Sequence, residues 1–282
     1  MRRFLRFSVL CLALGAANAC KPEEVFITED IPTAGIRFLN VVPDTGAVDF
    51  RPVDIVENST FYNMAHRSTG LFYYKNARAG ARHFRIFMSP DPALTAAEQQ
   101  AMASTVVWDS VVDLQAGRLY TFILWGNSRT GSTPARRLTV IEDTPSDPGA
   151  QVALRIVHAA PGLGELDVRA YKKGDPLPAA PTWAGVAELA VSVYQLANPD
   201  SILYNFQPAG GGANVIASDP LALVGVAGTI DINPIPGTRV AGSAVTGFIV
   251  PASVIPSKAP QTLTTPGFIS VWDRRPPNAP KG

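Results

Sequence analysis

The stretch "IRFLNVVPDTGAVDFR", Ile36–Arg51, recurs as "LRIVHAAPGLGELDVR", Leu154–Arg169. In one unshifted frame the two copies share five identities and keep apolar character at five further positions. The displacement of 118 residues is longer than the ~20–50 residues of a solenoid repeat unit, so it predicts duplication of a whole domain. The identical pairs are Arg37/Arg155, Pro43/Pro161, Gly46/Gly164, Asp49/Asp167 and Arg51/Arg169.

Each copy predicts a strand, a turn and a second strand. Alternation in "AVDFR" places Val48 and Phe50 on one face of a strand, and Asp49 and Arg51 on the other. Proline presets one turn dihedral and glycine permits a positive φ at the other end, which explains why both recur between the strands. The aspartate and arginine on the shared face predict a surface or intersheet ion pair in both copies.

Short apolar segments continue along the chain, separated by many of its 25 prolines and 23 glycines. Such a pattern is typical of an all-β fold, and each module matches the ~100-residue scale of an immunoglobulin domain. We therefore predict two tandem immunoglobulin-like antiparallel β-sandwich domains. The segments predicted as further strands are 70–76, 83–89, 105–114, 118–126, 136–143, 192–196, 201–209, 214–225, 228–235, 244–253 and 267–275.

One segment, "TAAEQQAMA" at 95–103, has a clear helix signal. Thr95 and Glu98 have the spacing of a capping box, and the residues around them are strong helix formers. We expect a short crossover helix between two strands.

The first twenty residues carry an export signal. Arg2, Arg3 and Arg6 precede the apolar run Phe7–Ala17, which is shorter than the ~20 residues that a membrane-spanning helix needs. Residues 1–19 are therefore predicted to be a signal peptide that is removed from the mature protein.

Two cleavage sites compete at "ANAC". The small-x-small triplet 17–19 fits ordinary signal peptidase and predicts a soluble secreted protein, whereas the step into Cys20 resembles a bacterial lipobox. Lipoboxes usually carry leucine where this chain has Ala17, so both interpretations stay open. Cys11 lies within the signal peptide, which makes Cys20 the single thiol of the mature chain, without an internal disulfide partner. This favours a lipidated Cys20 that anchors the protein to the membrane, and Lys21 resembles the residue after the cysteine in outer-membrane lipoproteins.

The chain is thus predicted to contain a signal peptide (1–19), a tether (20–35), a first sandwich domain (36–142), a linker (143–150) and a second sandwich domain (151–282). The tether is acidic, contains two prolines and shows no sustained period, as is typical of a spacer. The linker is rich in proline and glycine.

The doubled stretch resembles the DUF4397 domain family of bacteria, whose members open with a strand and a turn close to "VHASPDAPAVDVYVDG". Both "IVHAAPGLGELDVRAY" (156–171) and "FLNVVPDTGAVDFRPV" (38–53) match that outline. The segment "LQAGRLYTFILWG" (114–126) is similar to the family's later "L-x-A-G-x-x-Y-T" strand. The resemblance covers most of the first domain and the second as far as about Ala190. It implies tandem immunoglobulin-like sandwiches on an envelope or secreted protein, and it implies no catalytic residues.

Patterns that carry catalysis or metal binding are sparse. The three histidines show no HxH or HExxH spacing, so we expect no zinc site, no cofactor and no enzymatic activity. His158 and its counterpart Asn40 lie in the family turn, where either side chain can hydrogen-bond the turn backbone. A glycosidase needs two carboxylates ~5–9.5 Å apart, which clustering in sequence does not establish. The remaining histidines and the clustered carboxylates are His66, His83, Asp44, Asp49, Asp54 and Glu57.

Candidate binding residues lie in an aromatic run and in a polar loop. Phe72, Tyr73 and Tyr74 are consecutive, so a strand there exposes at least one aromatic ring. Such a ring could stack on a sugar, contact a protein or cover the junction between the two domains. Arg129 lies in the polar loop 126–137, whose chemistry suits recognition. The net charge of +1 gives no basic field for nucleic acid.

These observations predict a non-enzymatic protein of the bacterial cell envelope, lipid-anchored through Cys20. Its two modules would bind or scaffold an envelope protein or a glycan. The alternative is a carbohydrate-directed module, either a glycan binder or a weak glycoside hydrolase.

Overall fold

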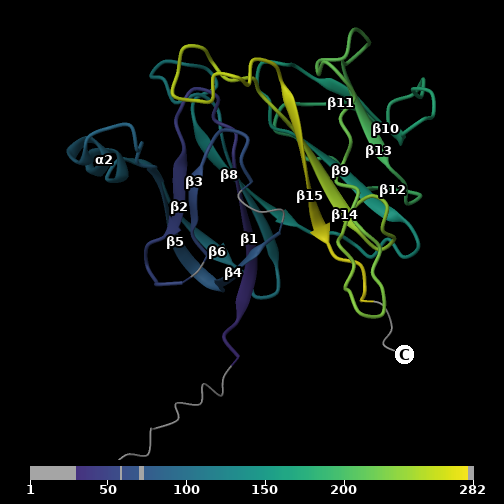
Figure 1. Cartoon of the computed structure of the whole chain (residues 1–282), viewed down its shortest axis with the longest axis horizontal. Helices are drawn as coiled ribbons and strands as arrows, with labels where there is room; N and C mark the ends of the chain where they lie inside the picture. Colours follow the sequence, from purple (N-terminus) through teal and green to yellow (C-terminus); the bar gives the residue numbers. More distant parts are fainter. Residues whose placement is uncertain (1–29, 58, 70–72, 279–282) are drawn as a thin grey trace, which may run out of the picture. The chain divides into compact units, whose positions relative to one another are not determined.

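The computed structural model describes residues 30–57, 59–69 and 73–278, so the predicted signal peptide, Cys20 and most of the predicted tether lie outside the described residues. The prediction of an all-β sandwich fold is confirmed, because strands make up 42% and helix 3% of the structure, and the strands form four sheets (Figure 1). All of these strands lie in one compact unit, Pro32–Gly282.

The strands of the first half form two facing sheets. Their bounds are β1 (Thr33–Asn40), β2 (Val48–Pro52), β3 (Phe61–Met64), β4 (Lys75–Arg78), β5 (Gly80–Met88), β6 (Val106–Leu114), β7 (Leu119–Trp125) and β8 (Arg137–Asp143). One sheet has the order β4-β1-β7-β8 and the other the order β3-β2-β5-β6. Pairing is antiparallel except between β1 and β7, which run parallel. β1 begins at Thr33, within the segment predicted as a tether.

The second half repeats this arrangement with one strand fewer. Its strands are β9 (Val152–His158), β10 (Leu166–Lys172), β11 (Trp183–Val186), β12 (Gln195–Ala197), β13 (Ile202–Pro208), β14 (Ala244–Val250) and β15 (Gly267–Arg274). The sheets have the orders β12-β9-β14-β15 and β11-β10-β13, and β9 pairs in parallel with β14. β13 takes the place of β5 in the second half, but no described strand flanks it as β6 flanks β5. At this edge of β13 there is instead an isolated bridge between Leu203 and Leu221.

Three apolar clusters show that the four sheets form successive layers. One cluster fills each sandwich; in the first, the ring of Phe50 stacks 4.8 Å from the rings of both Phe38 and Phe84. A third cluster joins the sheet of β1 to the sheet of β9 and includes Trp125 and Phe248. The layers follow one another along the long axis of Figure 1, with the sheets of β1 and β9 in the centre.

The predicted strand–turn–strand unit is confirmed in both copies. β1 and β2 form the first unit and β9 and β10 the second. Val48 and Phe50 are fully buried, as are Leu166 and Val168, which agrees with the predicted alternation.

We call the sheets that contain β2 and β10 the outer sheets. In each of them the recurring aspartate stabilises a β-bulge through a hydrogen bond. Pairing shifts register between Val48 and Phe50, and it shifts again at the corresponding place in β10. Asp49 Oδ1 accepts a hydrogen bond from the backbone N–H of Asn63 (2.9 Å), a residue in the left-handed region with φ +52°. Asp167 Oδ1 accepts one from Gly185 (2.9 Å), at φ +56°.

The predicted ion pair of the shared strand face forms in the first copy and is wrong for the second. Arg51 donates to Asp49. Arg169 instead donates to the carbonyl of Pro178 (2.9 Å) and to Gln207 Oε1 (3.1 Å). Asp167 accepts only from backbone N–H groups among the described residues, those of Gly185 and Gly210.

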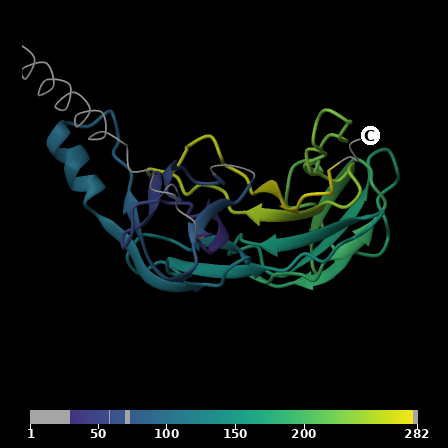
Figure 2. The same cartoon turned by 90° about the horizontal axis from the view of Figure 1, so that it is seen from below.

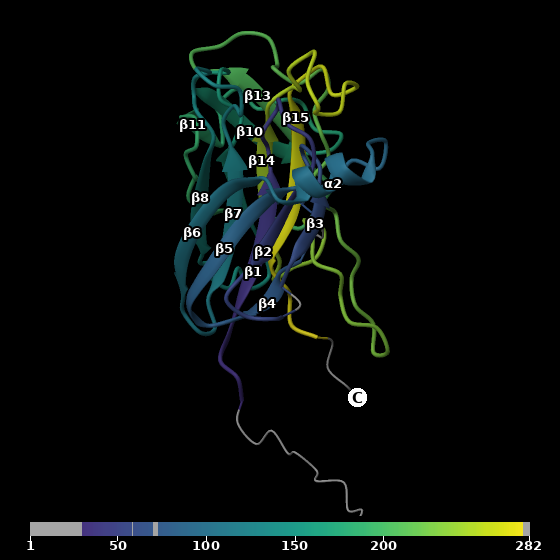
Figure 3. The same cartoon turned by 90° about the vertical axis from the view of Figure 1, so that its left-hand side faces the viewer.

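The predicted helix is confirmed as α2 (Ala96–Ala103), with its capping box: Thr95 Oγ1 accepts from the N–H of Glu98, and Glu98 Oε2 accepts from the N–H of Thr95 (2.9 Å). The predicted crossover is wrong, because β5 and β6, which α2 joins, are antiparallel neighbours. None of the helix residues is buried, and α2 projects beyond the sheets (Figures 2 and 3).

The strands predicted at 214–225 and 228–235 are also wrong. These segments form turns and isolated bridges, such as the one between Val226 and Ile235. Pro220, Pro234 and Pro236 remove backbone donors from this part of the chain, which explains why its alternating apolar residues do not form a ladder.

Candidate functional site

Two arginines of the doubled stretch meet between the sandwiches. Arg37 on β1 and Arg155 on β9 are only 1% and 3% exposed, although both are charged. Each lies opposite a threonine on the neighbouring parallel strand. Arg37 Nε donates to Thr121 Oγ1 (3.1 Å), and Arg155 Nε donates to Thr246 Oγ1 (2.8 Å).

Two aspartates each form an ion pair with the arginine of the other half. Asp143, at the end of β8, accepts from Arg155 of the other half (2.5 Å) and lies 3.5 Å from Arg37 of its own half. Asp273 on β15 accepts from Arg37 (2.8 Å) and lies 3.7 Å from Arg155. In both cases the shorter ion pair joins the two halves, so the arrangement is reciprocal.

Two tyrosines complete the arrangement. The hydroxyl of Tyr74 donates to Asp143 (2.8 Å), and Arg37 Cζ lies 4.5 Å from the centre of its ring. The hydroxyl of Tyr194 donates to Asp273 (2.9 Å), and Arg155 Cζ lies 4.7 Å from its ring centre. Each residue thus has a counterpart of the same type and role in the other half. We call this set the junction network: Arg37, Tyr74, Thr121, Asp143, Arg155, Tyr194, Thr246 and Asp273.

The electrostatics of the junction network keep its arginines charged. Burial alone would lower the pKa of Arg37 and Arg155, but neighbouring acidic groups outweigh burial, and both pKa values are raised. The largest raising contributions to the pKa come from Tyr74 and then Asp273 for Arg37, and from Asp273 and then Asp143 for Arg155. Burial raises the pKa of Tyr74 well above its ordinary value, so this phenol stays a protonated donor at neutral pH. Two guanidinium and two carboxylate groups balance, which lowers the cost of burying them.

The junction network bonds the two sandwiches to each other through enclosed side chains. Both aspartate side chains are 0% exposed, and each carboxylate already accepts hydrogen bonds from an arginine, a tyrosine and a threonine. Asp143 and Asp273 also line the pocket described below, where these donors already occupy their oxygens. The network therefore joins the two sandwiches into one body.

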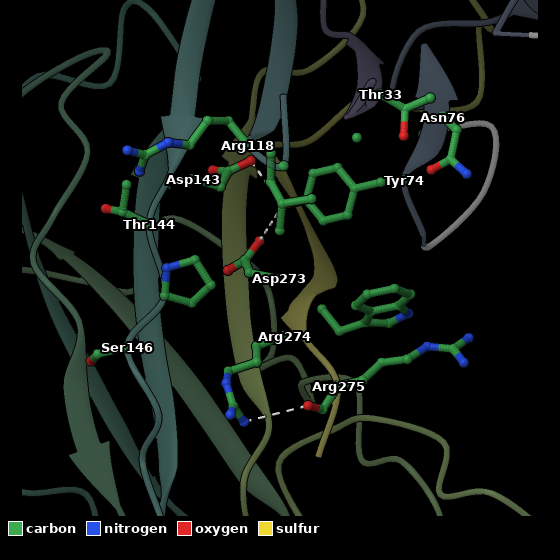
Figure 4. A pocket seen from close by; sticks show the side chains of 15 residues that line it. Thr33, Tyr74, Asn76, Arg118, Asp143, Thr144, Ser146, Asp273, Arg274 and Arg275 are labelled. Carbon is green, nitrogen blue, oxygen red and sulfur yellow. Dashed lines mark hydrogen bonds between the residues drawn. The ribbon is translucent and has the colours of Figure 1, made fainter. Parts of the chain in front are cut away.

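A pocket of about 750 Å³ opens beside the network, where the two halves meet (Figure 4). Its size lies within the ~300–1,000 Å³ typical of small-molecule sites. The rings of Tyr74 and Trp272 meet in its wall edge to face, with centres 6.0 Å apart. Arg275 Cζ lies 5.0 Å from the centre of the Trp272 ring. Further lining residues are Thr33, Asn76, Arg118 and Ser146.

The structure places the predicted binding residues in separate environments. Tyr73 is 44% exposed, whereas Tyr74 belongs to the junction network and lines the pocket. Arg129 does not line this pocket; its N–H donates to Asp44 (2.9 Å), and its guanidinium donates to the carbonyl of Pro256. The predicted lipidation site, Cys20, lies outside the described residues.

The backbone role predicted for His158 and Asn40 is confirmed. Asn40 Oδ1 accepts from the N–H of Val42 (3.1 Å), and His158 Nδ1 accepts from the N–H of Ala160 (3.3 Å). His158 Nε2 donates to the carbonyl of Gly164 (2.8 Å). Burial lowers the pKa of His158, which keeps its ring neutral and able to both accept and donate.

The other two histidines have different partners. His66 Nε2 donates to the carbonyl of Pro251 (3.0 Å), which also accepts from Arg67 (2.7 Å), so these contacts fasten the first half to the second. Burial lowers the pKa of His66 to about 4. His83 Nε2 lies 2.5 Å from Asp109 on the outer face of the first sandwich.

The carboxylates that cluster in the sequence bond to different groups. Asp44 accepts from the N–H of Ser128 (2.7 Å) as well as that of Arg129. Asp54 pairs with Arg82 (3.0 Å), and Glu57 accepts from Ser59 and from the N–H of Arg78. None of these contacts brings two carboxylates together around a shared cleft in the part of the chain that the structure describes.

Most of the junction network was not predicted from the sequence. The sequence shows the repeated Arg37 and Arg155, but it does not indicate their aspartate and threonine partners or the second tyrosine. The sequence does indicate that these arginines are buried, because each lies between apolar residues of a strand. In the first copy these neighbours are Ile36 and Phe38. A charge at such a position requires a buried partner.

The described ranges lack both a metal-ligand cluster and a helix able to cross a membrane. Among residues 30–57, 59–69 and 73–278, no group of three or more histidine, cysteine, aspartate or glutamate side chains could hold a metal ion. In the same ranges, no helix has the length and apolar character needed to cross a membrane.

Similarity to a known family covers the first sandwich and the opening strands of the second. Among curated proteins, none matches the chain. Residues 34–169 match the model of DUF4397, a domain of unknown function.

Proposed function

We propose that the chain is a non-enzymatic protein of the bacterial cell envelope, anchored by a lipid on Cys20, which presents two joined sandwiches for binding or scaffolding. The junction network supports this most directly. It ties two all-β modules into one unit through reciprocal buried ion pairs. A body of this kind holds its two outer sheets in a fixed relation, as a scaffold or a binding surface requires.

The bonding of two buried carboxylates and of two buried histidines supports the non-enzymatic part. The buried carboxylates near the pocket, Asp143 and Asp273, are enclosed by arginine and tyrosine donors. His66 and His158 bond to backbone groups and have lowered pKa values, which suits a structural role.

The envelope location rests on the N-terminal sequence. A basic start, the apolar run Phe7–Ala17 and the step into Cys20 match an export signal with a lipid acceptor. One lipid chain gives only reversible binding, so stable anchoring needs more than one chain, as a triacylated cysteine provides.

Labelling of cells with a palmitate analogue tests the anchor. We expect label in the wild type and none in Cys20→Ala, with the variant released from the membrane fraction. Cys11→Ala is the matched control, since this cysteine lies in the segment that is removed, and it should stay labelled. Wild-type protein that is exported, soluble and unlabelled would overturn lipid anchoring and leave plain secretion.

A second candidate function, carbohydrate binding, is favoured by the pocket beside the junction network. Tyr74 and Trp272 supply aromatic surface there, and polar side chains surround them. Aromatic rings with nearby donors are suited to hydroxylated rings.

A further inference from the structure

The pocket between the halves has two sides that differ in their polar groups. Thr33, Asn76 and Arg275 lie on one side of Asp273, and Arg118 and Ser146 lie on the other (Figure 4). The side chains come from the start of β1, from β4, from the turn before β7, from the segment after β8 and from the end of β15. The pocket is therefore formed only when both halves are in place.

Each charged side chain around the pocket has an oppositely charged partner, except for one arginine. Arg118 pairs with Glu142 (3.3 Å), and Arg274 donates to Asp147 (2.7 Å). The carboxylates at the base of the pocket are neutralised by the arginines of the junction network. Arg275 is exposed, and its guanidinium forms no ion pair and donates no hydrogen bond to any described residue. The pocket thus has one surplus positive charge at Arg275.

Uncharged donors on the same side also have no hydrogen-bond partner within the described part of the chain. The side chains of Thr33 and Asn76 make no hydrogen bond with the described residues. Arg275 lies against the ring of Trp272, and a guanidinium held in this way keeps its planar fork available for a carboxylate. The arrangement offers a cation, an amide, a hydroxyl and an aromatic ring within one pocket.

We propose that this pocket binds an acidic sugar, a pyranose ring that bears a carboxylate. Arg275 pairs with the carboxylate, Thr33 and Asn76 bond ring hydroxyls, and Trp272 contacts the apolar C–H face. This proposal rests on the carbohydrate-binding candidate and names its ligand class. It is independent of the lipid anchor, which the labelling experiment tests separately.

Titration calorimetry of the full chain at low ionic strength tests the ligand class with three probes. Trigalacturonate carries the sugar and the charge, its methyl ester carries the sugar alone, and triglutamate carries the charge alone. We expect trigalacturonate to bind at least about tenfold more tightly than either of the other probes, because charge-assisted hydrogen bonds are roughly twice as strong as neutral ones.

Variants assign the binding to the pocket. Arg275→Gln should weaken trigalacturonate binding at least about tenfold and leave the ester unaffected. Arg239→Gln is the matched control, since Arg239 is also exposed and without a hydrogen bond from its guanidinium, yet does not line this pocket. Both side chains are exposed, so an unchanged unfolding midpoint shows that each variant folds.

The outcomes distinguish failure of the acidic-sugar proposal from failure of carbohydrate binding in general. Equal binding of trigalacturonate and its ester would overturn the acidic class and retain carbohydrate binding. Binding of triglutamate alone would overturn both in favour of an acidic peptide. No binding of any probe, or equal loss in Arg275→Gln and Arg239→Gln, would also overturn the proposal.

Discussion

Arg37 and Arg155 are charged residues in strands that have a packed layer on each side. A buried charge costs several kcal/mol unless partners compensate for its lost hydration. Each guanidinium here bonds a threonine of its own half and an aspartate of the other half, and lies over a tyrosine ring. Removal of one carboxylate would leave both arginines with a single buried counter-ion.

His66 makes the stability of the fold depend on pH. Its pKa is about 4 in the folded protein against an ordinary value of 6.5, so below pH 6.5 the unfolded chain binds more protons than the folded one. The stability of the folded protein that depends on a neutral His66 is fully present above pH 6.5 and is lost as the pH falls toward 4. Between pH 7 and pH 5 this loss amounts to about 2 kcal/mol.

Urea unfolding of the wild type and His66→Gln at both pH values measures this dependence. Glutamine can donate to the carbonyl of Pro251 but does not titrate, so the stability difference between the two proteins should shrink on acidification. A difference that stays constant from pH 7 to pH 5 would contradict the assignment to His66.

At the scale of the elements, alternation predicted the long strands and failed for short or proline-rich segments. β5, β6, β7, β14 and β15 coincide closely with predicted segments. β3 and β11 have four residues each, too few for a period to stand out, and they pair through bulges. In 214–235 apolar alternation exists, but prolines remove the donors that a ladder needs.

Replacing the recurring aspartate of each bulge by alanine should lower the free energy of unfolding by different amounts in the two copies. Asp49 is 3% exposed, and its loss leaves the N–H of Asn63 without an acceptor, so Asp49→Ala should lower the free energy of unfolding by about 1–3 kcal/mol. Asp167 is less buried, so water can replace it and Asp167→Ala should cost less.

Asp54→Ala serves as the control for this series, because it removes only a partly exposed ion pair with Arg82, worth at most about 1 kcal/mol. Urea unfolding of the three variants ranks them. The bulge assignment would be wrong if Asp49→Ala cost no more than Asp54→Ala.

At the scale of the whole molecule, the sequence shows the repeat but hides how the copies fit together. Arg37 and Arg155 are 118 positions apart, whereas Asp143 and Asp273 are 130 apart, so one fixed frame finds only the arginines. The aromatic run predicts one exposed ring, which Tyr73 provides at 44% exposure, but it does not predict that the hydroxyl of Tyr74 donates to Asp143. Contacts between distant segments follow from tertiary packing, which local periodicity does not encode.

The doubled arginine joins the two sandwiches through reciprocal buried ion pairs, Arg37 with Asp273 and Arg155 with Asp143. The most direct test is a double-mutant cycle on Arg37 and Asp273, in which urea unfolding compares the wild type, Arg37→Met, Asp273→Leu and the double variant. We predict that the double variant loses less stability than the sum of the single variants, with a coupling of at least about 1 kcal/mol. Effects that add to within about 0.3 kcal/mol would contradict the claim.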